Sequence, residues 1–409
     1  MESIQQTFSG STGYGKRVTS TISRNGDLVH KMYLEHSFTT GAQNDNSDFC
    51  NNYGHALIRE CELEIGGQRI DKQYGRWMQI WSDLTEPNPT KAGPDVTGAT
   101  TDTHPGDIDG HTLFQRMTGT GMGLNGAGNG DDITPSSTQR YFIPLQFWFC
   151  RNPGLALPLI ALQYHEVKVI FQFENEEKLL RDVHNAASAL TASSFDLWVD
   201  YIYLDTDERR RFAQVSHEYL IEQLQYQNSS YTASTTQSID LNFNHPVKEL
   251  VWQFSDTASE TTLGADPATG DASTLAAGVE ITAGEFKLKL NGHDRFAERD
   301  FRYFTRVQVH QHHTGAGGNV YSKTNAAALG DSIAVYSFAL KPEEHQPSGT
   351  CNFSRIDNAQ LEITTAVTRV NSNNNSGGAA ATITNCHIYA VNYNVLRIMS
   401  GMGGLAYSN

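Results

Sequence analysis

Residues 195–204 read FDLWVDYIYL, with an apolar side chain at every second position. The face that these side chains share consists of Phe195, Leu197, Val199, Tyr201 and Tyr203. Asp196 and Asp200 fall on the opposite face of the same extended chain. A period of two is the periodicity of a β-strand, because successive side chains of a strand point to opposite sides. The stretch therefore predicts a strand with one mainly polar side.

Similar alternation recurs along the chain, whereas helical spacing is scarce. Alternating segments occur at 28–38, 61–65, 165–173, 247–254, 285–290, 333–340, 359–367 and 383–396. Residues 71–84 are the best helical candidate, with Tyr74, Trp77, Met78, Trp81 and Leu84 at steps of three and four before Pro87. A second short helix is expected after Asp205. Many short strands and few helices predict an all-β fold, a sandwich or a barrel.

Three polar, glycine-rich stretches interrupt this pattern, at 86–140, 256–284 and 368–382. They carry little apolar periodicity, so they are expected to be long surface loops. Long loops on a rigid β scaffold are common places for recognition or assembly contacts.

A weak internal repeat suggests two copies of one β domain. Residues 63–70, LEIGGQRI, resemble residues 288–296, LKLNGHDRF, with one insertion. Each copy follows an alternating strand, and each precedes a turn with proline and glycine, at Pro153 or Pro347. The predicted organisation is a domain at 1–205 that includes the loop 86–140, a linker with a short helix at 206–224, and a domain at 225–409.

The composition excludes several classes of protein. The 409 residues include 30 Lys and Arg against 45 Asp and Glu, a net charge of −15. Nucleic-acid binding needs clustered cations, so no direct nucleic-acid partner is expected. No run of 18 apolar residues occurs and the first residues do not resemble a signal peptide, so a soluble protein made in the cytoplasm is expected. The five cysteines have no metal-site spacing and are expected to be free, mostly buried thiols.

Motifs that could indicate chemistry are weak. GMGLNG at 121–126 matches a dinucleotide fingerprint, but it lies in a glycine-rich tract without a flanking strand and helix, so a flexible loop is expected. His310 and His312 could lie on one face of a strand and bind a metal, but a solvated strand end fits better, because no carboxylate follows them closely. Carboxylate pairs such as Glu343 and Glu344 are expected to be exposed. No catalytic residue, cofactor site or metal site is predicted.

Two further groups of residues are candidates for contacts or modification. Arg209, Arg210 and Arg211 lie beside two acidic residues, and we interpret them as a salt-linked linker or subunit contact rather than a phosphate site. Glycosylation sequons begin at Asn228, Asn352 and Asn374, and Asn374 lies in the most polar loop. Without a signal peptide these asparagines are expected to be unmodified.

Longer stretches resemble one known family. The most specific is residues 152–167, NPGLALPLIALQYHEV. Further matching blocks are EIGGQRID at 64–71, RFAQ at 211–214, HEYLIEQL at 217–224, PSGTCNFSRID at 347–357 and YNVLRIMSGMGGLA at 393–406. Together they resemble the major capsid proteins of nucleo-cytoplasmic large DNA viruses, and above all the algal, chlorella-virus type.

This resemblance implies a double jelly roll, two tandem eight-stranded antiparallel sandwiches with loop insertions. It implies a pseudo-hexagonal homotrimer, the capsomer, which contacts neighbouring capsomers and minor capsid and penton proteins in an icosahedral shell over an internal membrane. It also implies localisation in the virion. Family members usually carry an N-terminal arm before the stretch that matches residues 2–7, and here only Met1 precedes it. The contacts of such an arm are therefore not carried over.

Two other functions remain open at this point. A β-sandwich that binds carbohydrate could use exposed Trp and Tyr side chains on its loops, and a metal-dependent jelly-roll enzyme could use His310 and His312. For the capsid interpretation, Arg209–Arg211 and the segment from Met399 to Tyr407 are expected to help dock the two jelly rolls.

Overall fold

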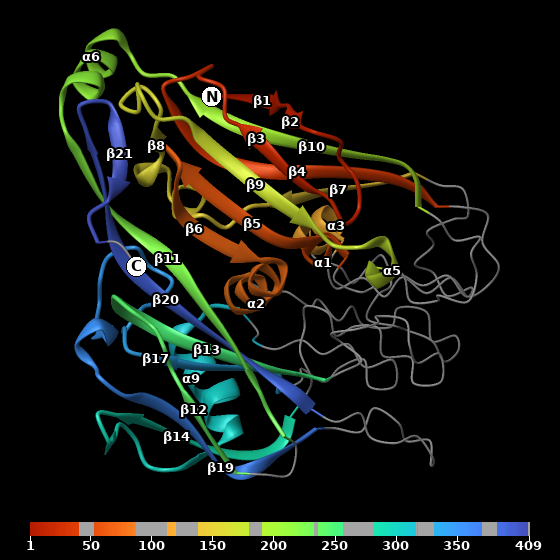
Figure 1. The fold of residues 1–409 in the computed structure, drawn as a ribbon, viewed down its shortest axis with the longest axis vertical. Coiled ribbons are helices and arrows are strands. Elements are labelled where there is room, and N and C mark those ends of the chain that lie inside the picture. Colours follow the sequence, from red (N-terminus) through yellow and green to blue (C-terminus); the bar gives the residue numbers. More distant parts are fainter. Residues whose placement is uncertain are drawn as a thin grey trace.

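The structure is a computed structural model of the whole chain, in which two β-sandwiches follow one another (Figure 1). The described residues are 1–40, 53–86, 113–119, 138–179, 190–232, 236–256, 281–315, 317, 331–369 and 383–407. Most of the three predicted loops, the 121–126 motif and Cys50 lie outside these residues. Among the described cysteines, Cys61, Cys150 and Cys386 are buried free thiols, as expected, and Cys351 is a half-buried one.

The first sandwich consists of two antiparallel sheets built from β1 to β10. One sheet has the order β1-β10-β4-β7, with β8 paired to β4. Its strands are β1 Glu2–Gln6, β10 Leu190–Ile202, β4 Leu28–Thr40, β7 Thr138–Pro144 and β8 Leu157–Pro158. The other sheet, β2-β3-β9-β5-β6, contains β2 Phe8–Ser9, β3 Arg17–Thr21, β9 Val167–Phe173, β5 Ile58–Ile65 and β6 Gln68–Tyr74.

The second sandwich consists of two sheets built from β11 to β21. Its first sheet has the order β11-β20-β13-β17, and its second β12-β19-β14-β15. The strands of the first are β11 His217–Ser230, β20 Ile383–Met399, β13 Pro246–Asp256 and β17 Ile333–Ser337, with β18 Cys351–Asn352 on β13 and β21 Met402–Leu405 on β20. The strands of the second are β12 Gln237–Asp240, β19 Ala359–Arg369, β14 Ile281–Leu290 and β15 His293–Asp294, with β16 Arg299–Asp300 on β14.

The two sandwiches repeat the same topology, which confirms the internal repeat. The sheet order β1-β10-β4-β7, with β8 paired to β4, corresponds strand by strand to the order β11-β20-β13-β17, with β18 paired to β13. The matching sequences at 63–70 and 288–296 form the same hairpin. Its turn is Gly66–Gly67 in one copy and Asn291–Gly292 in the other, and all four residues have positive φ. A two-residue hairpin turn of type I′ requires positive φ at both of its central residues, which favours Gly and Asn.

Each sandwich has its own apolar core between its sheets. The first core contains Leu34, Phe38, Phe171 and Val199, and the second contains Trp252, Phe254, Phe286 and Ile388 among others. The alternation predicted for 195–204 is confirmed from Phe195 to Tyr201, whose apolar side chains are buried, but it was wrong for Tyr203, which is exposed beyond the end of β10 at Ile202.

Short helices occupy the connections. They are α1 Tyr53–Leu57, α2 Gly75–Thr85, α3 Leu113–Thr118, α4 Trp148–Arg151, α5 Glu176–Leu179, α6 Thr206–Gln214 and α9 Gln308–His312. Single turns are η1 Pro153–Leu155, the π-turn η2 Tyr303–Val307, and η3 Phe353–Arg355. The helix expected after Asp205 is confirmed as α6. The predicted linker 206–224 thus contains α6 and the first residues of β11, and the domain boundaries remain a prediction.

Two local predictions were wrong. Residues 71–74 belong to β6 rather than to the helix, because they pair with β5, Tyr74 opposite Glu60. The segment with His310 and His312 is helical rather than extended. Its buried positions, Phe301, Phe304, Thr305, Gln308 and Val309, follow the helical period of three and four residues.

Gly75 sets the start of α2 and gives the first prediction. A Cβ atom at this position would lie 2.0 Å from the carbonyl oxygen of His55 and 2.2 Å from that of Ile58. Because backbone must move to accept it, Gly75→Ala is expected to lower the free energy of unfolding by about 3 kcal/mol or more in a denaturant titration. Gly154→Ala is the control, since its Cβ would meet only the Asn152 side chain at 3.2 Å. A loss of less than about 1 kcal/mol for Gly75→Ala would contradict this account.

Candidate functional site

The two sandwiches meet where α2 of the first packs on the outer face of the sheet β11-β20-β13-β17; we call this contact the seam. On α2, the apolar face consists of Trp77, Ile80, Trp81 and Leu84, at the spacing that places side chains on one side of a helix. The sheet contributes Val251, Ile333, Val335, Tyr389 and Val391, and all these side chains are buried. The ring centroids of Trp77 and Tyr389 are 5.3 Å apart. Burial of such side chains contributes about 1.5–3 kcal/mol each.

A buried cluster of charged groups lies beside this apolar contact. The carboxylate of Glu222 on β11 forms ion pairs with Arg151 of α4, at 2.9 Å, and with Lys248 of β13, at 2.8 Å. Burial raises the pKa of Glu222, but the two cations outweigh this effect and leave it below its ordinary value. Arg151 also lies over the Trp81 ring, 4.7 Å from its centroid. The cluster thus ties the first sandwich to two strands of the second.

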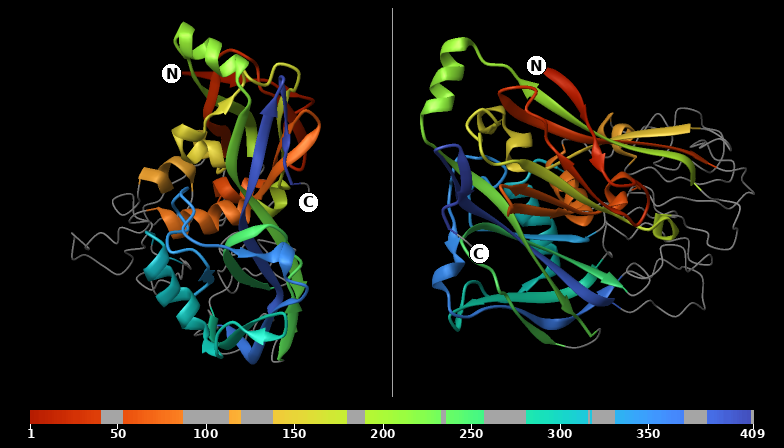
Figure 2. Two further views of the ribbon diagram at one scale, coloured as in Figure 1. Left: turned by 90° about the vertical axis from the view of Figure 1, so that its left-hand side faces the viewer. Right: turned by 45° about the horizontal axis from the view of Figure 1, so that its top comes forward.

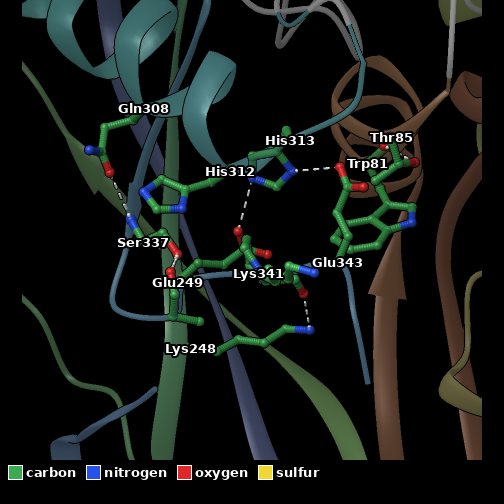
Figure 3. Close-up of polar contacts among 12 residues, drawn as sticks. Trp81, Thr85, Lys248, Glu249, Gln308, His312, His313, Ser337, Lys341 and Glu343 are labelled. Atoms are coloured by element: carbon green, nitrogen blue, oxygen red, sulfur yellow. Dashed lines mark hydrogen bonds and ion pairs between the residues drawn. The ribbon is translucent and has the colours of Figure 1, made fainter. Parts of the chain in front are cut away.

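His313 lies beside the end of α2 at the seam, and its charge is paired within the second sandwich (Figure 3). Its ring nitrogens lie 3.1 Å from carboxylate oxygens of Glu249 on β13 and of Glu343. Burial lowers the pKa of His313, but the two carboxylates outweigh this effect and raise it to about 9. His313 is therefore a cation at neutral pH, with its charge compensated on both sides. Glu343 was expected to be exposed, but its side chain is mostly buried.

The residues after His313 satisfy the free carbonyl groups at the end of α2. The amide of Gly315 donates to Leu84 O at 2.7 Å, and the hydroxyl of Thr314 donates to Thr85 O at 3.0 Å. The last carbonyls of a helix have no partner within it, so such bonds hold the helix end in place. Figure 3 shows Thr85 and Trp81 of α2 beside this histidine.

The strands β6 and β11 add a polar contact between the sandwiches. The amide of Leu224 donates to the buried Asp71 carboxylate at 3.0 Å, and the Gln223 side chain donates to Ile70 O. Asp71 begins the segment that the sequence assigned to a helix, and it instead connects two sheets.

The segment from Met399 to Tyr407 crosses back to the first sandwich. Tyr164 donates its amide to Gly401 O at 3.0 Å, and Leu405 donates its amide to Gln68 at 3.3 Å. Leu405 is half-buried against the first core. The Met399 and Tyr407 side chains are exposed, although Tyr407 O accepts a bond from Asn394. The contacts of this segment are therefore made by its middle rather than by its two ends.

The three arginines lie on α6, which has no buried residue. Arg209 pairs with Asp27 of the first sandwich at 2.9 Å, while Arg210 and Arg211 are exposed. The carboxylate of Asp27 also accepts the amide of Leu204, just before the helix. Of the predicted group, one arginine thus fastens α6 to the first sandwich.

The described glycosylation sequons and the two histidines His310 and His312 lie on different elements of the fold. Asn228 is exposed on β11, Asn352 accepts from the Ser354 amide within η3, and Asn374 lies outside the described residues. His310 is exposed on α9, and His312 lies 3.1 Å from Leu340 O. Within the described residues, no three His, Cys, Asp or Glu side chains come together as metal ligands would. No helix in that part of the chain has the length and apolar character needed to cross a membrane.

His313 gives a prediction about pH. Because its pKa in the folded chain lies above the ordinary 6.5, its ionic contacts contribute fully below about pH 6.5, and this contribution is lost as the pH rises to about 9. His313→Gln is expected to lower the free energy of unfolding at pH 6 by about 2–3 kcal/mol, and the difference from wild type should shrink towards pH 9. Urea titrations across this range measure it, with the exposed His310→Gln as control. A difference that is independent of pH would contradict the assignment.

Comparison with known proteins identifies the family of this chain. Residues 1–205 match a family described as "Major capsid protein N-terminus", and residues 208–404 match "Large eukaryotic DNA virus major capsid protein". The major capsid protein of Pyramimonas orientalis virus is 45% identical, over 100% of this chain and 90% of the relative. That of Paramecium bursaria Chlorella virus 1 is 40% identical, over 100% of this chain and 91% of the relative.

Solved structures agree with these matches. A quasi-atomic structure of the PBCV-1 virus capsid superimposes with a TM-score of 0.76 at 37% identity, over 100% of this chain and 96% of that one. The Faustovirus major capsid protein has a TM-score of 0.66 at 14% identity, over 97% of this chain and 90% of that one, a likeness of fold alone. The double jelly roll is thus the fold of this chain. The chain belongs to the family of major capsid proteins of large eukaryotic DNA viruses.

Proposed function

We propose that this chain is the major capsid protein of a large DNA virus and that three copies form a pseudo-hexagonal capsomer, the unit that tiles an icosahedral shell. The observation that carries this proposal is the repeat of one sandwich topology within a chain of this family. Six similar sandwiches around one axis need only three chains, and a closed ring repeats every contact.

The same proposal includes the partners and the place of the protein. It acts as a structural, non-enzymatic component of the virion, made in the host cytoplasm. Its partners are other copies, neighbouring capsomers, and minor capsid and penton proteins. The internal membrane beneath the shell is an indirect neighbour, and nucleic acid is not bound directly. Domains at 1–205 and 225–409 with a linker at 206–224 complete the proposed organisation.

The capsomer predicts a definite mass in solution. The chain has a mass of 45.2 kDa, so light scattering on a sizing column should give about 136 kDa, three times that value. The measurement uses the purified full chain over a range of concentrations. A mass that stays at 45.2 kDa at the highest concentration would contradict the proposed trimer.

We also propose that the segment from Met399 to Tyr407, together with Arg209 of the Arg209–Arg211 group, helps to dock the two jelly rolls. The bonds of Gly401 and Leu405 to the first sandwich and the Arg209–Asp27 pair support this role. The sequons at Asn228, Asn352 and Asn374 are proposed to be unmodified in the assembled shell.

The docking role predicts unequal effects within β21. Leu405→Ala removes apolar area that packs against the first core, so it should lower the free energy of unfolding by about 1–2 kcal/mol. Met402→Ala, on the same strand but 51% exposed, is the matched control and should change it by less than about 0.5 kcal/mol. Denaturant titration measures both. Equal effects of the two substitutions would argue against docking by this segment.

A further inference from the structure

The first turn of α2 rests on α1, the short helix before β5. Gly75, the first residue of α2, lies against the carbonyl groups of His55 and Ile58, so closely that a Cβ atom would come within 2.0 and 2.2 Å of their oxygen atoms. All five residues of α1, Tyr53–Leu57, are buried. In the left view of Figure 2, α2 (orange) lies at the junction of the two sandwiches. A displacement of α1 therefore removes support from the helix that forms the seam.

A buried histidine of β4 holds the first residue of α1. His36 Nδ1 lies 2.8 Å from Ser194 O, which can only accept, so this nitrogen carries the proton of the ring. His36 Nε2 then accepts, and the hydroxyl groups of Tyr53 and Tyr14 lie 3.0 and 3.2 Å from it. The two hydroxyl groups are themselves 3.0 Å apart. The neutral ring of His36 thus joins β4 and β10 to α1.

A second buried histidine lies on α1 and connects it to α2. His55 is fully buried, and its Nδ1 lies 2.8 Å from the side-chain oxygen of Gln79 on α2. The Gln79 side chain donates in turn to both carboxyl oxygens of Asp83, at 3.1 and 3.2 Å. The other ring nitrogen, His55 Nε2, has no hydrogen-bond partner in the described part of the chain. A proton on this nitrogen would be buried without an acceptor, so the arrangement fits only the neutral ring.

The surroundings of His36 are aromatic. The ring centroids of Phe195 and Phe38 lie 4.4 and 5.4 Å from that of His36. The carboxylates on the elements around it are bound elsewhere: Glu35, Asp196, Glu174 and Glu176 contact Trp198, Gln5, Lys178 and the Leu190 amide, respectively. Burial lowers the pKa of His36 to about 4, although the bond to Ser194 O opposes this effect.

His55 has no ionised partner among the described residues either. Burial raises the pKa of Asp83 to about 8, so this carboxyl group is neutral in acid and cannot compensate a charged ring. The cation of α2, Arg76, lies within hydrogen-bonding distance of Gln253 in the second sandwich, at 3.4 Å. The ring of Phe114 on α3 lies 6.1 Å from that of His55. Burial lowers the pKa of His55 to about 4, although its hydrogen bond opposes this effect.

We propose that His36 and His55 form a pH-sensitive switch that holds α1 in place when both rings are neutral and releases it in acid. Each added proton places a charge in apolar surroundings, where no carboxylate compensates it. Release of α1 exposes the first turn of α2 and weakens the seam from the side of the first sandwich. His313 is the opposite case, because its two carboxylates keep it charged and paired. The switch lies within one chain, so it is independent of the proposed trimer.

The pH dependence of unfolding tests the switch. The ordinary pKa is 6.5 and the pKa in the folded chain is about 4, so the stabilising effect of each neutral ring is complete above pH 6.5 and is lost as the pH falls to 4. Between pH 7.5 and pH 5, each histidine is expected to lower the folding equilibrium constant about 30-fold. His36→Gln and His55→Gln keep a side chain that can form hydrogen bonds but does not titrate. In urea titrations, each variant should therefore show a fall that is about 30-fold smaller than that of the wild type.

His310→Gln is the matched control, because His310 is exposed on α9. Its stability should fall between pH 7.5 and pH 5 as much as that of the wild type. A wild-type pH dependence that persists in His36→Gln or in His55→Gln overturns the switch. The mass of the wild-type chain in solution does not enter this test, so a failure of the proposed trimer is distinguished from a failure of the switch.

Hydrogen exchange on the wild-type chain covers the case in which a variant fails to fold. Protection factors, corrected for the intrinsic effect of pH on exchange, are compared at pH 7.5 and pH 5. Residues 53–57 and the first turn of α2 should lose more protection in acid than β20, Ile383–Met399, in the second sandwich. Equal losses in α1 and in β20 overturn the inference.

Discussion

The packing of α2 on an outer sheet face is the interaction on which the rest of the structure depends. A sandwich normally buries the inner faces of its sheets and leaves the outer faces to water. In the second sandwich the outer face is itself apolar, with Val251, Val335 and Tyr389. The indole rings of Trp77 and Trp81 on α2 pack on this apolar face and remove it from water. The two sandwiches are therefore parts of one folded unit rather than two independently folded domains.

The polar groups around the seam determine which arrangement of the two sandwiches is reached. Apolar faces can slide, whereas the Glu222–Arg151 pair and the bonds of Thr314 and Gly315 to the end of α2 fit in one position only. A buried ion pair adds little net stability over an apolar pair of the same shape, but a misplaced partner leaves a buried charge without compensation, which costs several kcal/mol. The charges at the seam thus act mainly on the register of the sandwiches, and the indoles act mainly on their stability.

Local patterns in the sequence predicted the strands, the helical face of α2, α6 and the repeated hairpin, because each depends on neighbouring residues. Residues 71–74 were misassigned because Tyr74 continues the spacing of Trp77 and Trp81 while its pairing partner, Glu60, lies elsewhere. The helix around His310 could have been found from the period of Phe301, Phe304 and Val309. The pairing of His313 could not, since its partners lie 64 and 30 residues away and no local pattern connects them.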